Sequence, residues 1–182
     1  MMLSRIREDV RTMRRRDPAA LDDLTVFLVY PGLHAVWFHV FLAAPLYERW
    51  PLLGRLVAHF VRFATGVEIH PGADIGRRVT IDHGDGVVVG ETAVVGDDVH
   101  MYHGVTLGGD DPRPVKRHPT VGAGATIGAN ATLIGDLAVG EDATIGAGSV
   151  VTRDVPADAT VAGIPAKPVG SEAAEPDGER ED

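Results

Sequence analysis

The sequence contains no cysteine, which excludes disulfide bonds, thiolate metal ligands and a cysteine nucleophile. A chain without cysteine suits a reducing compartment, and we expect this protein in the cytoplasm. Lysine is nearly absent as well, because Lys116 and Lys167 are the only lysines beside fifteen arginines. This preference is typical of GC-rich or salt-adapted sources, and the composition does not choose between them.

The chain also lacks an excess of positive charge, because 26 acidic residues outnumber 17 basic ones. The formal net charge of −9 argues against a nucleic-acid partner, which would need a basic surface against its phosphates. Part of the negative charge lies in residues 171–182, where six acidic residues accompany one arginine. We expect this segment to be a disordered acidic tail.

No apolar segment favours a membrane span. The most apolar stretch, Leu24 to Tyr47, has no charged residue, but Pro31-Gly32 and Pro45 interrupt it. This pattern predicts short helices packed on each other or on a neighbouring subunit, and no membrane partner. We also expect no export signal, because the start of the chain is charged and has no apolar core with a cleavage site.

Two periodicities divide the chain near residue 65. Before it, apolar side chains recur at helical spacing, and Asp17-Pro18 is expected to end the first helix and cap the next. From Ile69 onward, an aliphatic residue or methionine returns every six residues, a spacing that neither an α-helix nor a flat β-strand produces. We predict an α-helical N-terminal region at 1–65 and a repeat domain at 66–170.

The six-residue repeat predicts a three-sided coil. Six residues suffice for a short strand and a turn, so three units close one coil, and its aliphatic residues stack on those of the next coil about 4.8 Å away. Glycine follows the aliphatic residue in eight of thirteen units and permits the bend. The thirteen residues are Ile69, Ile75, Ile81, Val89, Val95, Met101, Leu107, Val121, Ile127, Leu133, Val139, Ile145 and Val151.

This pattern resembles the repeat of the hexapeptide-repeat acyltransferases. The resemblance implies a mainly β fold, a left-handed parallel β-helix behind the helical region. It also implies a homotrimer with active sites in the clefts between subunits.

Two interruptions break the repeat, and each carries a histidine beside a charged residue. The step from Ile81 to Val89 is two residues too long and contains Asp82-His83, whereas the segment 108–119 adds eight residues and contains Arg117-His118. Because inserted residues must leave the stacked wall, we expect the functional site at these two places.

The residues around both interruptions closely resemble the serine O-acetyltransferase family, in order along residues 5–170. The resemblance implies that the chain moves an acetyl group from acetyl-CoA, a co-substrate and not a tightly bound cofactor, to the hydroxyl of L-serine. The products would be O-acetyl-L-serine and CoA, in the first step of cysteine biosynthesis. The matching motifs are Asp17-Pro18-Ala19-Ala20, Tyr30-Pro31-Gly32-Leu33-His34-Ala35, Glu68-Ile69-His70-Pro71-Gly72-Ala73, Asp82-His83-Gly84, Gly90-Glu91-Thr92, Val105-Thr106-Leu107-Gly108-Gly109 and Arg117-His118-Pro119.

His83 is the predicted general base. A serine hydroxyl is a poor nucleophile at neutral pH, and histidine titrates in the range needed to take its proton. The resemblance implies that Glu68, where many members have aspartate, holds the second nitrogen of the imidazole.

The charged ends of serine need partners too. By the resemblance, Asp17 and Asp82 engage the substrate at its ammonium group, and Arg117 with His118 binds its carboxylate. Gly108-Gly109 would let the backbone approach the thioester and present N–H groups to the oxyanion.

The CoA site is predicted with one open question. The cofactor-binding residues are then Gly108 and Gly109 at the thioester, with Ala129 and Ala147 along the later coils, where the resemblance places the pantetheine arm and small side chains leave a groove. Family members often have lysine where this chain has Thr132 and Thr144. The phosphate contacts would then fall to other cations, with Arg113, Lys116 and Arg153 as candidates.

Three alternatives remain open at this stage. One is a hexapeptide acetyltransferase for another hydroxyl acceptor, and another is a scaffold without catalysis. The third is a γ-type carbonic anhydrase, whose zinc would need three histidines such as His100, His103 and His118. The spacing does not match the His-x4-His pair of that family, so we predict no metal site. We expect His70 and His100 at the surface and His103 at a trimer interface or in the lumen.

The oligomer and further partners are predicted by resemblance alone. A helical region shorter than in hexameric members predicts a trimer, with a dimer of trimers as the alternative. In the family, a C-terminal isoleucine inserts into O-acetylserine sulfhydrylase. This chain ends in Glu179-Arg180-Glu181-Asp182, so we expect that complex to be weak or absent. Cysteine could occupy the serine site as a feedback inhibitor, with a strength that the sequence does not reveal.

Overall fold

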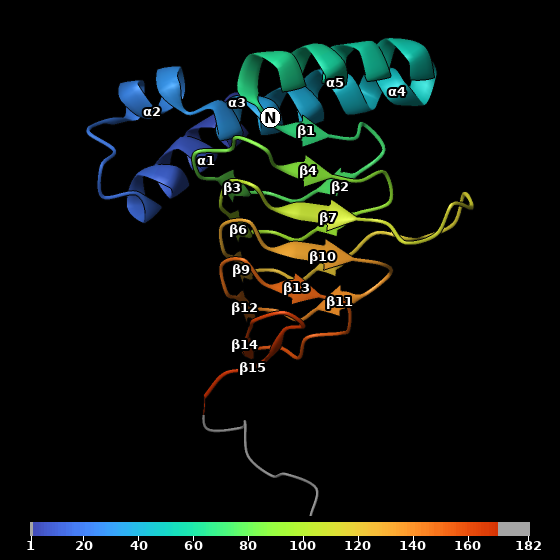
Figure 1. The fold of residues 1–182 in the computed structure, drawn as a ribbon. Helices are drawn as coiled ribbons and strands as arrows, with labels where there is room; N and C mark the ends of the chain where they lie inside the picture. The colour runs from blue at the N-terminus through green and yellow to red at the C-terminus, as the bar shows by residue number, and fades with distance from the viewer. Residues whose placement is uncertain (1, 171–182) are drawn as a thin grey trace, which may run out of the picture.

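The computed structural model describes residues 2–170, so the tail predicted at 171–182 lies outside the described residues. Helices form the N-terminal part and cover one end of a column of short strands (Figure 1). The last helix ends at Gly66, whose φ of 73° is a left-handed conformation that glycine adopts without strain. The helices are α1 (Met2–Arg16), α2 (Asp23–Val29), α3 (Pro31–Phe38), the π-helical turn η1 (His39–Ala43), α4 (Ala44–Arg49) and α5 (Pro51–Thr65).

The apolar stretch at 24–47 forms short helices, as predicted. Within residues 2–170, no single helix is long and apolar enough to cross a membrane. One pair, Asp23–Val29 with Pro31–Arg49, reaches that length and composition only together, and it is bent by 69°.

The strands wind into a left-handed parallel β-helix with three sheets, as predicted. Sheet A has the order β1-β4-β7-β10-β13, sheet B the order β11-β8-β5-β2, and sheet C the order β15-β14-β12-β9-β6-β3. Among the strands of residues 2–170, only β15 pairs antiparallel, with β14. The strands are β1 (Glu68–Ile69), β2 (Asp74–Ile75), β3 (Thr80–Ile81), β4 (Val88–Val89), β5 (Val94–Val95), β6 (His100–Met101), β7 (Thr106–Gly108), β8 (Thr120–Val121), β9 (Thr126–Ile127), β10 (Thr132–Ile134), β11 (Ala138–Val139), β12 (Thr144–Ile145), β13 (Val150–Val151), β14 (Thr160–Ala162) and β15 (Lys167–Pro168).

The repeat residues form the core of the coil. All thirteen point inward and are at most 7% exposed, and each pairs in register with its counterpart one coil away, as Val89 does with Leu107. Val155 and Val161 continue the buried stack beyond the thirteen. A second buried column, two residues before each repeat residue, consists mainly of valine and alanine, such as Val105 and Ala131. Two residues of each six-residue unit are therefore buried in the interior of the coil.

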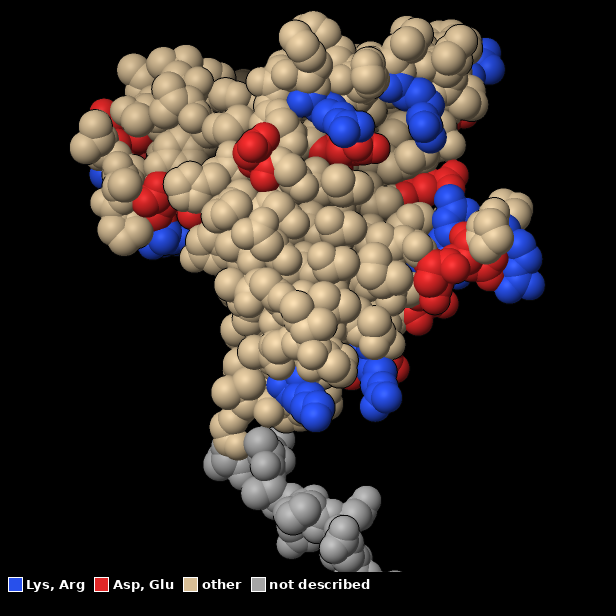
Figure 2. Space-filling view, in the orientation of Figure 1, with Lys and Arg blue, Asp and Glu red and all other residues tan. Residues whose placement is uncertain are grey.

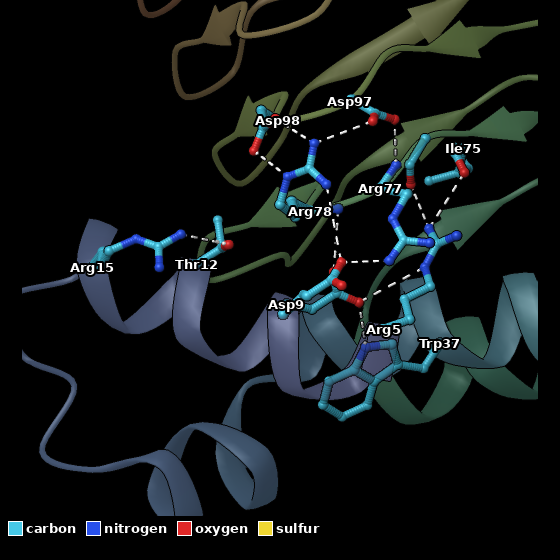
Figure 3. A network of polar contacts seen from close by, with 12 residues as sticks. Arg5, Asp9, Thr12, Arg15, Trp37, Ile75, Arg77, Arg78, Asp97 and Asp98 are labelled. Atoms are coloured by element: carbon cyan, nitrogen blue, oxygen red, sulfur yellow. Dashed lines mark hydrogen bonds and ion pairs between the residues drawn. The ribbon is translucent and has the colours of Figure 1, made fainter. Parts of the chain in front are cut away.

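The buried carboxylate of Asp9 fixes helix α1 to the β-helix. Trp37 of α3 donates its indole N–H to Asp9 Oδ2 at 2.9 Å, and the backbone N–H of Arg78 donates to Oδ1 at 3.2 Å (Figure 3). Burial raises the pKa of Asp9, and these donors oppose the rise. The carboxylate thus joins α1 and α3 to the turn between β2 and β3.

Arg16 holds the other end of α1 in place. Its guanidinium donates to the Thr80 hydroxyl and to the Asp98 carbonyl oxygen, both at 2.5 Å. Asp17 follows directly, so these contacts set its place relative to β3. The prediction that Asp17 caps the next helix is wrong, because α2 begins six residues later and Asp22 supplies its N-cap.

Candidate active site

The two interruptions of the repeat lie at opposite edges of sheet A. The residues between β3 and β4 form the corner where the chain passes from sheet C to sheet A, and they contain His83. Residues 109–119 leave the coil after β7, where the chain passes from sheet A to sheet B, and they contain His118 (Figure 1). A single chain therefore presents the two predicted site histidines on different corners of its coil.

His83 is exposed at the first corner and has an unusual backbone. Its φ of 60° lies in the left-handed region, which few non-glycine residues adopt. The backbone N–H of His83 donates to Oδ1 of Asp82 at 3.0 Å. Its ring meets the ring of His103 edge to face, with centroids 5.8 Å apart. His103, which we expected at an interface or in the lumen, thus lies beside the predicted base.

Asp17 lies near enough to His83 for their charges to interact, although 66 residues separate them in the sequence. The backbone N–H of Ala19 donates to Asp17 Oδ1 at 2.7 Å, and the Tyr30 hydroxyl donates to Oδ2. The Tyr30 hydroxyl, the Ala19 N–H and the nearby His83 hold the pKa of Asp17 below its ordinary value. Asp82 is close enough to contribute to the raised pKa of Tyr30, so both predicted ammonium-binding carboxylates lie near His83.

Glu68 lies on β1 but does not contact His83 here. Its carboxylate is 2.7 Å from Arg62 Nη1, at the end of α5. No hydrogen bond or ion pair joins Glu68 to His83 within residues 2–170. The longer glutamate side chain reaches the cation on α5, so the predicted pairing with His83 stays a prediction.

His118 is buried at the second corner, and Thr92 fixes its ring. The backbone N–H of Thr92 donates to His118 Nδ1 at 3.2 Å, and the Thr92 hydroxyl lies 2.9 Å from the same nitrogen. Burial, and then the neighbouring Arg117, lower the pKa of His118. A neutral ring with an N–H donated to Nδ1 carries its own proton on Nε2, so Nε2 is the available donor.

Glycine is required beside this ring. A β-carbon added at Gly90 would lie 2.1 Å from His118 Nε2, and one at Gly109 would lie 3.0 Å from it. The backbone N–H of Gly109 makes no hydrogen bond within residues 2–170. The corner therefore offers an imidazole N–H and a backbone N–H next to each other.

Arg117 is held at the same corner. Its guanidinium pairs with Glu91 at 2.7 Å, and its backbone N–H donates to the Thr92 hydroxyl at 3.0 Å. The next residue, His118, donates its own backbone N–H to that hydroxyl at 3.2 Å. Sequence reasoning had matched Glu91 and Thr92 to the family motif but assigned them no role.

The predicted CoA residues are divided between the two corners. Gly108-Gly109 lies at the His118 corner, whereas Ala129 and Ala147 lie at the C-to-A corners of the coils beyond His83. These two alanines are on successive coils, because the N–H of Gly148 donates to the carbonyl of Ala129 at 2.8 Å. The small side chains thus continue the column that begins at His83 and His103.

His100 and His70 are less exposed than the surface positions predicted for them. His100 is buried on β6 and bonded to the Thr80 hydroxyl at 2.7 Å, so the expectation of a surface position is wrong. The Thr80 side chain and the end of α1 cover this part of sheet C. His70 is half-buried against Arg55 of α5 at 2.6 Å. Within residues 2–170, no three His, Asp or Glu side chains converge in a way that could hold a metal ion.

Comparison with known proteins places the chain in a family. Residues 118–153 match the family model described as "Bacterial transferase hexapeptide (six repeats)". The serine acetyltransferase of Mycobacterium tuberculosis is 53% identical over 178 residues, which cover 97% of this chain and 77% of that protein. The chain belongs to the serine acetyltransferase family.

Solved structures of serine acetyltransferases agree with this result. The soybean enzyme, determined in complex with serine, superposes with a TM-score of 0.87 at 42% identity, over 92% of this chain and 69% of that one. The enzyme of Brucella abortus, determined in complex with coenzyme A, gives a TM-score of 0.87 at 40% identity, over 91% and 66%.

Proposed function

We propose that this chain is a serine O-acetyltransferase that makes O-acetyl-L-serine and CoA from L-serine and acetyl-CoA. The proposal rests on one observation in a chain of this family. The two breaks in the repeat place His83 and His118 at two corners of the coil, and each corner carries different functional groups. The exposed His83 lies near two carboxylates, and the buried His118 lies beside Arg117 and the backbone N–H of Gly109, which makes no hydrogen bond within residues 2–170. These groups complement the hydroxyl, ammonium and carboxylate of serine.

The imidazole of His83 takes the proton of the serine hydroxyl as its oxygen attacks the thioester carbonyl carbon. The tetrahedral oxyanion that forms is stabilised by backbone N–H groups of Gly108-Gly109. When the C–S bond breaks, the imidazolium returns the proton to the departing thiolate. Glu68 would assist as the partner of His83 if its side chain turns from Arg62.

Serine is held at both ends. Asp17 and Asp82 receive the ammonium group beside His83, and Arg117 with the Nε2–H of His118 receives the carboxylate. Exclusion of water from these charge-assisted bonds would strengthen them.

The two corners combine if His83 of one protomer faces His118 of the next, so we propose a homotrimer with shared sites. The front of the molecule over β4, β7, β10 and β13 shows almost no charge, and charged residues gather at its edges (Figure 2). A protomer face of this kind can lie against its neighbours without burying unpaired charge. A dimer of trimers is the alternative assembly.

The proposal extends to the phosphates of CoA. Among the three candidate cations, Arg113 is paired with Asp111, and Lys116 lies 3.8 Å from Asp136. Arg153, which follows β13, is exposed and forms no ion pair within residues 2–170. It is therefore the best placed of the three for a phosphate group.

The proposed organisation is a helical region at 1–65, the acyltransferase β-helix at 66–170 and an acidic tail at 171–182, in a cytoplasmic enzyme.

Release of free CoA from acetyl-CoA tests the reaction itself. Serine, homoserine, a galactoside and chloramphenicol are offered in turn, at low and at high salt. We expect serine to give the highest kcat/KM by a wide margin. A preference for any other acceptor would assign the chain to a different hexapeptide acetyltransferase, and no serine-dependent release at either salt concentration would refute the proposal.

A further inference from the structure

The side chain of Tyr30 has no role in the mechanism above, although it lies among the predicted ammonium-binding groups. Tyr30 separates α2 from α3, and its ring is half-buried. Its hydroxyl donates to Oδ2 of Asp17, and Asp82 is near enough to act on its charge. The phenol is therefore bonded to one carboxylate and lies near a second, and the two carboxylates come from separate elements of the fold.

The backbone beside Tyr30 is packed tightly against the corner that carries His83. A β-carbon added at Gly32 would lie 2.1 Å from the carbonyl oxygen of Ile81, and one at Gly84 would lie 3.6 Å from Gly32. Only glycine permits the start of α3 to approach β3 so closely. The position of Tyr30 is consequently fixed relative to His83 by backbone packing.

The hydroxyl of Tyr30 remains a donor at every working pH. Burial, followed by the hydrogen bond and the charge of Asp17, raises the pKa of Tyr30 to about 12. Asp17 in turn has one carboxylate oxygen bonded to Ala19 N–H and the other bonded to Tyr30. With a donor on each oxygen, the carboxylate has a single orientation, and its remaining lone pairs are available to a cation.

We propose that Tyr30 is a positioning residue for the amino group of the substrate. It holds the Asp17 carboxylate in the orientation that receives the ammonium of serine beside His83. This inference rests on the proposed function, since it assumes that serine binds between Asp17 and His83. Tyr30 would thereby strengthen the binding of serine and leave the rate of acetyl transfer largely unchanged.

The test is Tyr30→Phe, which removes the hydroxyl and keeps the ring in place. One lost hydrogen bond to a charged group corresponds to about a tenfold rise in KM for serine. We expect kcat and the KM for acetyl-CoA to stay within about threefold of wild type, because neither the base nor the thioester site is touched. Tyr47→Phe is the matched control, because the Tyr47 hydroxyl makes no hydrogen bond within residues 2–170.

A double variant separates positioning from a general structural effect. Asp17→Asn should raise the KM for serine more than Tyr30→Phe does, and Tyr30→Phe added to Asp17→Asn should change it little further. An unchanged KM in Tyr30→Phe, or effects that multiply in the double variant, would overturn the inference alone. A wild-type protein without serine-dependent CoA release would overturn the proposed function and this inference together.

Discussion

Thr92 offers a sharp test of the second corner, because one hydroxyl supports both predicted carboxylate-binding residues. It accepts the backbone N–H groups of Arg117 and His118 at 3.0 and 3.2 Å and lies 2.9 Å from His118 Nδ1. Valine has nearly the same shape without the hydroxyl. Thr92→Val therefore removes three contacts and leaves the β-branched side chain in place.

The size of the effect follows from these contacts. A hydrogen bond between uncharged groups contributes about 1 kcal/mol net, so the three together are worth about 1 to 3 kcal/mol. The backbone N–H of Thr92 still donates to His118 Nδ1, which keeps part of the ring orientation. We expect kcat/KM for serine to fall by roughly tenfold to a hundredfold, because every 1.4 kcal/mol is a factor of ten.

Initial rates of CoA release at varied serine give this quantity directly. Thr126→Val is the control, because the Thr126 hydroxyl on β9 makes no hydrogen bond within residues 2–170. The control should keep wild-type kcat/KM within about twofold, because the substitution removes no hydrogen bond. If Thr92→Val matched the control while both proteins melted like wild type, Arg117 and His118 would not act in the site as described.

Three further predictions concern the base, the pH dependence and the core. His83→Ala should lower kcat by about two to four orders of magnitude in a CoA-release assay, as expected for loss of a general base. His83→Asn, which tolerates the left-handed backbone better, should do the same. Wild-type turnover in both variants would show that His83 is not the base. Burial lowers the pKa of His39 to about 4. Between pH 6.5 and that value, the unfolded chain therefore binds more protons than the folded chain. The free energy of unfolding should consequently fall by about 3 kcal/mol as the pH drops through this window. Urea unfolding of His39→Leu should show a weaker loss over the same window, and an unchanged loss would assign the acid sensitivity elsewhere. Ile127→Ala should cost about 2 to 5 kcal/mol, because Ile127 is fully buried in the stack, and a melting temperature equal to wild type would contradict the packing described.

The coil itself was predictable because its rule is local. Each repeat residue, such as Leu107, must be aliphatic to fill the interior, and each break in spacing must leave the wall. The second buried column escaped prediction. Residues such as Ala131 are small, and alanine is common at the surface as well as in cores.

The contacts of the site were less predictable than its residues. The motifs pointed to Asp17 and His83, but the hydrogen bond from Tyr30 depends on how α3 meets β3, and no spacing encodes that approach. The partner of Glu68 could not be predicted from the motifs either, because it is Arg62 at the end of α5. Pairings across separate elements depend on packing that a one-dimensional pattern does not describe.

The position of His100 illustrates how the helices alter a prediction made for the coil alone. An outward-facing strand residue of a bare β-helix would be exposed. Here Arg16 from α1 reaches Thr80, which bonds to His100, and the histidine is covered. The periodicity of the repeat could not reveal which side of the coil the helices occupy.

The shared site between protomers is tested most directly by mixing two inactive variants. His83→Asn lacks the base, and His118→Asn lacks the imidazole donor but keeps an acceptor for the N–H of Thr92. Random mixing of the two in a trimer gives roughly a quarter of the clefts one intact His83 and one intact His118 from adjoining protomers. We predict that the whole mixed population, in which mass spectrometry verifies the mixed trimers, recovers about a quarter of wild-type CoA release, because each mixed trimer has about a third of its clefts intact. Mixed trimers no more active than either parent would contradict the account.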